Sequence, residues 1–321
     1  MELKPEIIKK IELLEEKYST MGQDISSYLD GLLYSDYLTY WDYIHLDTLL
    51  TMQNPKTHFP DEEIFIMYHQ ITELYFKMML NEFEQIANRK ENLVEFMIAR
   101  ITRINRYFEN LTRSFDVMIE GMEPDQFHKF RMSLLPASGF QSVQYRMIEI
   151  CSTEFINLVA KDVRDDYSKK GNISIDELFN HIYWRAGATE LATGKQTLTL
   201  IQFEEKYADK LISLAKRYKE TNLLHLYKSL DADAQKNEKL IIALRQLDVN
   251  VNINWPLSHY KSAVKYLQKD PEDIKATGGT NWQKYLPPRF QKRIFYPELW
   301  TDDDLNNWGK KWVESVVFGL A

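Results

Sequence analysis

The stretch FHKFRMSLLPASGFQSVQYR, residues 127–146, joins a basic helical segment to a tight polar corner. In its first part, Phe127, Arg131 and Leu134 have the spacing of one helical face. An arginine on such a face is costly to bury unless an anion meets it. Two interpretations follow from the residues alone: a site for a small anionic ligand, or an ordinary helical corner with a solvated arginine.

The second part of this stretch predicts the corner itself. Pro136 is expected to end the preceding helix, because proline lacks the backbone N–H that a helix interior needs. Gly139 permits a positive φ that other residues resist. Ser138, three residues before Gln141, predicts a capping box that opens the next helix.

The composition limits the class of protein. The chain has 321 residues, of which 44% are hydrophobic and 27% charged, as in soluble globular proteins. A net charge of −7 argues against nucleic acid and anionic membranes as general partners. The single cysteine, Cys151, excludes an intrachain disulfide and a multi-cysteine zinc site. No apolar run approaches membrane-spanning length and no signal peptide is apparent, so we expect a cytoplasmic protein.

The periodicity of apolar residues predicts helices throughout, and no set of alternating runs indicates strands. The expected fold class is all-α, a multi-helix bundle that forms a single domain over residues 1–321. A polar stretch at about 161–173 is interpreted as a surface excursion. Helices are expected at residues 5–18, 61–87, 91–120, 175–184, 196–217 and 223–247, and after Trp255.

His69 lies in the segment 61–87, which has apolar residues on two faces. One face carries Phe65, His69, Thr72 and Phe76. The other carries Ile64, Met67, Tyr68, Ile71, Leu74, Tyr75 and Met78. A helix with two apolar faces is expected to be packed on more than one side. A lone histidine in such a place is most often a hydrogen-bonded core residue, and a functional role is the alternative.

His259 follows Trp255 and Pro256, and Pro256 suits the first turn of a helix. Ser262 and Ala263 share the face of His259, so they leave a flat recess beside the imidazole. A planar macrocycle bound by the histidine would need such a recess. Close contact between two helices would need it equally.

Taken together, these segments make the chain resemble the tryptophan 2,3-dioxygenase family, which are all-helical haem enzymes. The resemblance spans about residues 38–300. Its most specific part is the run SGFQS at 138–142 with FR at 130–131 upstream. The other matching segments are YWDY at 40–43, DE at 61–62, HQ at 69–70, ELYFK at 73–77, PA at 136–137, WPLSH at 255–259 and TGG at 277–279.

The resemblance implies a homotetramer that binds haem b without a covalent link. The lack of a Cys-x-x-Cys-His motif agrees with this expectation. His259 matches the histidine that ligates the iron, which leaves the opposite face of the iron open for O2. Ser138 and Gly139 match the corner near a haem edge.

The resemblance also implies a set of substrate-binding residues. His69 would accept a hydrogen bond from the indole N–H, and Arg131 would hold the carboxylate in a bidentate pair. The remaining implied contacts are Phe65, Phe127 and Leu134 in the wall of the pocket, Thr277 at the ammonium and carboxylate groups, and Tyr40, Tyr43 and Ile44 in the N-terminal helices (about 1–50), which would reach a neighbouring subunit's pocket.

The implied reaction of tryptophan catabolism inserts both atoms of O2 across the indole C2–C3 bond of L-tryptophan, giving N-formyl-L-kynurenine. Two departures from the family pattern, Trp41 and Tyr75, leave an alternative open. It is a related haem oxygenase or monooxygenase that acts on a substituted indole or another aromatic amino acid. Composition alone would also fit a non-enzymatic helical oligomerisation module.

Overall fold

The computed structural model describes residues 3–36, 38–134, 137–171, 173–188, 195–267 and 292–309. Within these ranges the regular secondary structure is helical, and an isolated β-bridge pairs Val159 with Ile182. The predicted all-α fold class is therefore confirmed. No helix in the described ranges combines the length and apolar character needed to cross a membrane.

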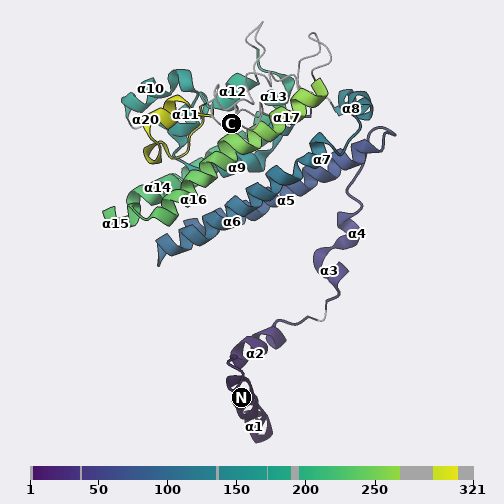
Figure 1. Cartoon of the computed structure of the whole chain (residues 1–321), viewed down its shortest axis with the longest axis vertical. Coiled ribbons are helices and arrows are strands. Elements are labelled where there is room, and N and C mark those ends of the chain that lie inside the picture. Colours follow the sequence, from purple (N-terminus) through teal and green to yellow (C-terminus); the bar gives the residue numbers. More distant parts are fainter. Residues whose placement is uncertain are drawn as a thin grey trace. The chain divides into compact units, whose positions relative to one another are not determined.

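The chain divides into two compact units, residues 1–54 and residues 55–321. The first unit contains α1 (Pro5–Ser19), α2 (Ile25–Leu33), α3 (Tyr40–Ile44) and α4 (Leu46–Leu49) (Figure 1). None of these four helices contains a buried residue, although they are rich in leucine, isoleucine and tyrosine. The expected single domain over 1–321 stays a prediction.

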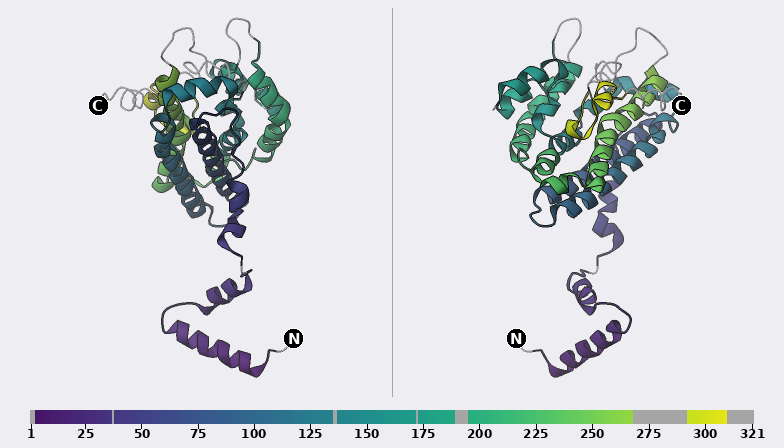
Figure 2. Two further views of the ribbon diagram at one scale, coloured as in Figure 1. Left: turned by 90° about the vertical axis from the view of Figure 1, so that its right-hand side faces the viewer. Right: turned by 60° about the vertical axis from the view of Figure 1, so that its left-hand side comes forward.

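Two long helices, α5 (Asp61–Ala87) and α6 (Leu93–Ser114), lie side by side in the second unit (Figures 1 and 2). The bounds of α5 are those predicted. Its first turn is acidic, as the helix macrodipole favours, and the buried carboxylate of Glu62 accepts the backbone N–H groups of Lys56 and Thr57 at 2.7 Å each. The helix predicted at 91–120 is interrupted at Phe115 and continues as the short α7 (Asp116–Ile119).

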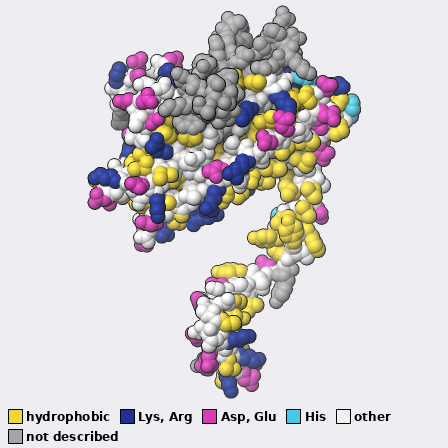
Figure 3. All heavy atoms as spheres, in the orientation of Figure 1, with side chains coloured by type: hydrophobic (Ala, Val, Ile, Leu, Met, Phe, Trp, Pro, Cys, Tyr) yellow, Lys and Arg dark blue, Asp and Glu magenta, His cyan; other side chains and the backbone are white. Residues whose placement is uncertain are grey.

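The two apolar faces of α5 have different environments. One face is buried against the core through Tyr68, Thr72, Phe76, Met79, Phe83 and Ile86. The α5 stripe, which we define as Met67, Ile71, Leu74 and Met78, is 38–50% exposed. The expectation that α5 is packed on both faces is therefore wrong for the described part of this chain. Figure 3 shows hydrophobic side chains on the surface of the second unit along the edge where α5 runs in Figure 1.

The rest of the second unit consists of shorter helices and one long rod. The helices predicted at 175–184 and 223–247 are each divided, whereas the one predicted at 196–217 is continuous as α13. The shorter helices are α8 (Pro124–Arg131), η1 (Met132–Leu134), η2 (Gly139–Gln141), α9 (Val143–Ser152), η3 (Phe155–Leu158), α10 (Lys161–Lys170), α11 (Ile175–Phe179), α12 (Tyr183–Gly187), α13 (Leu198–Arg217), α14 (Leu223–Ser229), α15 (Ala232–Gln235), η5 (Pro297–Leu299) and α20 (Asp302–Asn306).

The rod consists of α16 (Glu238–Val249), the π-helical turn η4 (Asn250–Asn254) and α17 (Trp255–Leu267), which follow one another without a break. It packs on α6 through both α16 and α17 (Figure 1). Pro256 is the second residue of α17, in the first turn as predicted, although α17 continues directly from the π-helical turn.

Candidate active site

His69 is on α5, and its ring is fixed by a local hydrogen bond. The imidazole Nδ1 lies 2.7 Å from the backbone carbonyl oxygen of Phe65, one turn earlier. A carbonyl oxygen can only accept, so Nδ1 carries the hydrogen in the neutral ring and Nε2 keeps its lone pair. Burial lowers the pKa of His69 from its ordinary value, which favours this neutral form. The side chain is half-buried, so it keeps surface that a ligand could contact.

An aromatic cluster stands beside His69 and connects α5, α8 and α17. The Phe65 ring lies 4.2 Å from the His69 ring, 6.2 Å from Phe127 and 5.7 Å from Phe130, measured between centroids. Phe127 in turn lies 4.7 Å from Tyr266 of α17. Sequence reasoning identified Phe65 and Phe127 but missed Phe130 and Tyr266, since only the packing of α8 against two other helices brings them in.

Arg131 is the last residue of α8, and only 6% of its surface is exposed. A cation is favoured at this end of a helix, where the macrodipole is negative. Phe127 lies one turn before it in α8, while Leu134 follows in η1 and is half-buried against the core. Phe127 and Arg131 thus lie in an α-helix, whereas Leu134 lies in the 3-10 turn that follows it. Pro136 and Thr277 lie outside the described residues.

His259 is on α17 and packs beside two aromatic rings, which also contact each other. Its centroid is 4.6 Å from that of Phe115 and 4.7 Å from that of Trp255. Burial, with a smaller contribution from the nearby His69, lowers the pKa of His259 to about 3. The two half-buried histidines are therefore close enough for His69 to affect the pKa of His259. Because both pKa values are lowered, both rings are neutral at pH 7. Trp255 could have been found from sequence, because it precedes His259 by four residues on the same helical face.

The side chains beside His259 leave it accessible. Ser262 and Ala263, one turn later, are half-buried, and no described residue forms a hydrogen bond with the His259 imidazole. Among the described residues, no group of three histidine, cysteine or acidic side chains could hold a bare metal ion. Iron bound through a single histidine, as in a macrocycle, is the metal chemistry that this arrangement fits.

The corner after α8 has the predicted capping box. The backbone N–H of Phe140 donates to Ser138 Oγ at 3.3 Å, and the Gln141 side chain accepts from the Ser138 N–H, also at 3.3 Å. Gly139 does not use the positive φ that glycine permits, because it begins the 3-10 turn η2. A Cβ placed on Gly139 would meet no described atom within 4 Å, so space is open beside it.

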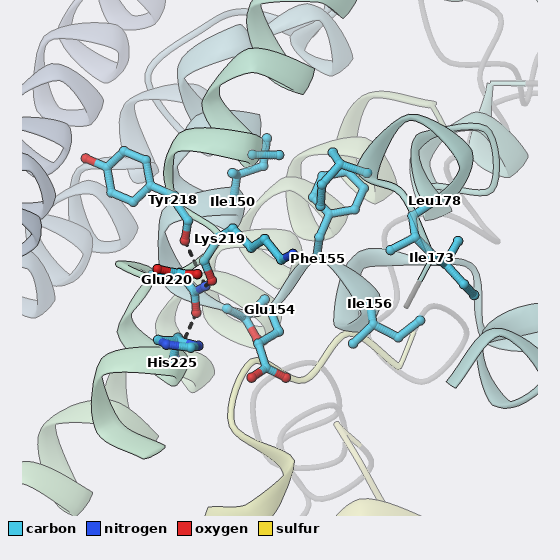
Figure 4. Close-up of a pocket in the computed structure, with 14 residues that line it drawn as sticks. Ile150, Glu154, Phe155, Ile156, Ile173, Leu178, Tyr218, Lys219, Glu220 and His225 are labelled. Carbon is cyan, nitrogen blue, oxygen red and sulfur yellow. Dashed lines mark hydrogen bonds between the residues drawn. The ribbon is translucent and has the colours of Figure 1, made fainter. Parts of the chain in front are cut away.

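Tyr40, Tyr43 and Ile44 form most of α3 in the first unit, and the two tyrosine side chains are largely exposed. In the second unit the structure brings Phe65, His69 and Phe127 together, and His69 lies near enough to His259 to affect its pKa. Arg131 and Leu134 follow Phe127 on α8 and η1. A separate cavity of about 420 Å³ opens among α9, η3, α11 and the segment from α13 to α14, with Glu154, Lys219 and His225 among its lining residues (Figure 4). None of the candidate site residues lines it.

Comparison with known proteins places the chain among relatives. Residues 31–170 match the family model described as tryptophan 2,3-dioxygenase. A tryptophan 2,3-dioxygenase of Ruegeria sp. (strain TM1040) is 39% identical over 117 residues, which cover 36% of this chain and 42% of that protein. One from Herpetosiphon aurantiacus is 42% identical over 118 residues, again 36% of this chain, so both matches span less than half of those relatives.

A longer match covers most of both chains. The tryptophan 2,3-dioxygenase of Bacillus cereus (strain ZK / E33L) is 35% identical over 274 residues, which are 83% of this chain and 92% of the relative. With the all-helical fold and this degree of identity, the chain belongs to the tryptophan 2,3-dioxygenase family.

Proposed function

We propose that this chain is a haem-dependent dioxygenase that cleaves the indole C2–C3 bond of L-tryptophan with O2 to give N-formyl-L-kynurenine. The observation that carries the proposal is the pair of neutral, half-buried histidines, His69 on α5 and His259 on α17, which share one electrostatic environment. Family membership supports the same activity.

The residues around His259 fit haem b. A neutral imidazole is the form that ligates iron, and burial keeps His259 neutral. The small side chains of Ser262 and Ala263 leave room for a flat group beside the ring, and the open space at Gly139 would suit its edge near Ser138. When bound, the haem iron supplies the oxygen chemistry, whereas the protein supplies binding and orientation.

His69 would orient the substrate ring. An indole N–H can only donate, and Nε2 of His69 is left as an acceptor by the hydrogen bond between Nδ1 and the Phe65 carbonyl. The lowered pKa of His69 keeps that acceptor free of a proton at pH 7. Phe65 and Phe127 would cover the indole with apolar surface and exclude water, with the buried Phe130 packed behind them.

Arg131 would fix the other end of the substrate. Its guanidinium can pair with the two oxygens of the amino-acid carboxylate in a bidentate arrangement, which sets direction as well as distance. Holding a substrate at both ends contributes mainly through positioning. Thr277, which lies outside the described residues, is proposed from the resemblance alone to contact the ammonium and carboxylate groups.

A homotetramer is proposed as the working assembly. Its support is the exposed α5 stripe and the absence of buried side chains in the four described helices of residues 1–54. Tyr40, Tyr43 and Ile44 would then contact the pocket of a neighbouring subunit. Light scattering should give four times the chain mass for the wild type and a smaller particle for Ile71→Glu. A monomeric wild type would contradict the assembly.

The activity is tested by reconstituting the chain with haem, reducing it without oxygen, adding L-tryptophan and then admitting O2. We expect a Soret band after reconstitution and the absorbance of N-formylkynurenine after O2. A chain that takes up no haem would overturn the proposal. Haem uptake with turnover of another aromatic amino acid, but not of tryptophan, would overturn the substrate.

A further inference from the structure

The π turn η4 sets the direction in which His259 points. The backbone N–H of Trp255 donates to the carbonyl of Asn250, five residues earlier, whereas an α-helix would use the residue four earlier. One extra residue in the turn rotates everything after it by roughly 100° relative to an uninterrupted α-helix. His259 follows four residues after Trp255, so its place on the bundle depends on this turn.

The π turn leaves one buried carbonyl without a helical donor. Val251 would normally receive the N–H of Trp255, but that group donates to Asn250. The next position, 256, is a proline and has no N–H. The hydroxyl of Tyr145, on α9, donates to the Val251 carbonyl at 2.8 Å and so replaces the missing donor. Buried carbonyls need such partners.

A cluster of amide side chains holds the same turn against α6. Asn250 accepts hydrogen bonds from Gln246 at 3.1 Å and Asn254 at 3.0 Å, and it donates to Asn105 at 3.2 Å. Asn105, on α6, donates in turn to the carbonyl of Ala243 at 3.0 Å. Asn105 and Asn250 are both buried. The turn is thus tied to α6 on one side and to α9 on the other.

These contacts connect the two parts of the proposed haem site. The helix α9 begins directly after the Ser138–Gln141 corner, and its Tyr145 reaches the turn that precedes His259. We propose that Tyr145 and Asn250 are positioning residues that hold the π turn and thereby aim the His259 imidazole at the haem iron. This inference rests on the proposed function, because it concerns how the iron ligand is placed.

The first test compares two variants that each lose one tyrosine hydroxyl. Tyr145→Phe removes the donor to Val251, while Tyr227→Phe removes a hydroxyl that donates to the carbonyl of Gln235 at 2.9 Å in a different part of the unit. In Tyr145→Phe we expect haem to dissociate about tenfold faster, because groups that orient a ligand typically have effects of this size. The iron–histidine stretching band of the ferrous protein should also shift. Tyr227→Phe should change neither.

The second test needs no haem. Hydrogen exchange of the haem-free protein should show faster exchange at the amides of Trp255 and residues 257–259, by about tenfold, in Tyr145→Phe and in Asn250→Ala. Asn222→Ala is the control, since it removes another buried asparagine, which donates to the Tyr218 and Lys219 carbonyls away from the rod.

The outcomes separate the two proposals. Haem uptake by the wild type with equal haem dissociation and equal vibrational spectra in Tyr145→Phe and Tyr227→Phe would overturn the positioning role and leave the proposed function standing. Exchange at Trp255 and residues 257–259 that Tyr145→Phe and Asn250→Ala leave unchanged would overturn it as well. A wild type that takes up no haem would overturn the proposed function and this inference with it.

Discussion

His69 and His259 are neighbouring half-buried histidines that are held in place by different kinds of contact. His69 lies on α5, a regular helix of 27 residues, and its ring is fixed by a carbonyl one turn away on the same helix. His259 follows a π turn that is held by side chains from α6 and α9. The first histidine is placed by local structure, and the second depends on contacts far away in sequence. Changes at a distance should therefore disturb His259 more readily than His69.

The largest expected effect separates the roles of the two histidines. His259→Ala should abolish the Soret band of the reconstituted protein, because the proposed iron ligand is removed. His69→Ala should keep the band. Haem titration followed by absorbance measures both, with His225→Ala as a control at a histidine that lines the separate cavity. Equal loss of haem in the His69 and His259 variants would contradict the assignment of iron ligation to His259 alone.

On the His69 side, Arg131 should have the next largest effect. Arg131→Leu is expected to weaken tryptophan binding by about 100-fold or more while haem binding is kept, because a buried carboxylate would lose its charged partner. Lys129→Leu, at an exposed position of the same helix, should have little effect on either. Calorimetric titration of the haem-loaded protein measures the affinity. If haem and tryptophan binding fall together in Arg131→Leu, the arginine is structural.

The pH dependence of tryptophan binding should report on His69. Burial lowers the pKa of His69 below the ordinary 6.5. Nε2 is therefore unprotonated between about pH 8 and pH 6.5, and the affinity for tryptophan should be constant over this range. At lower pH a proton on Nε2 removes the acceptor, and the affinity should fall. His69→Ala should bind tryptophan about tenfold more weakly, with no such fall from this group. A wild-type affinity that already declines above pH 6.5 would argue against this role.

The smallest effect is expected for a substitution of Gly139, in the Ser138–Gln141 corner. It tests whether Gly139 lies beside the haem that His259 is proposed to bind. Gly139 has no positive φ and open space at its Cβ position, so Gly139→Ala should stabilise the haem-free protein by up to about 1 kcal/mol. If a haem edge lies there, the same methyl group should weaken haem binding a few-fold. Denaturant unfolding and haem titration give the two values. Unchanged haem affinity would remove Gly139 from the cofactor site.

The sequence predicts α5 well, because its acidic first turn and apolar period are local signals, and its bounds were those observed. It does not reveal whether an apolar stripe is covered by the same chain, so the α5 stripe was wrongly expected to be buried. The π turn was missed for a related reason. Pro256 indicates a helix start locally, and the Tyr145 hydroxyl that donates to the Val251 carbonyl in the turn is more than a hundred residues away.

The corner shows the same limit on a smaller scale. Ser138 and Gln141 specify a capping box by their spacing, which the structure confirms. Gly139 allows many backbone conformations, so its type alone could not show that it would begin a 3-10 turn. The roles of His69, Arg131 and His259 came from the resemblance and stay proposals, whereas their burial and partners came only from the fold.

The most direct measurement is the fate of oxygen during turnover. The reduced, haem-loaded protein is mixed with L-tryptophan and 18O2, and the product is analysed by mass spectrometry. We predict N-formyl-L-kynurenine in which both inserted oxygen atoms carry the label. A product with a single labelled oxygen, or no product from tryptophan in a protein that holds haem through His259, would contradict the proposed dioxygenase activity.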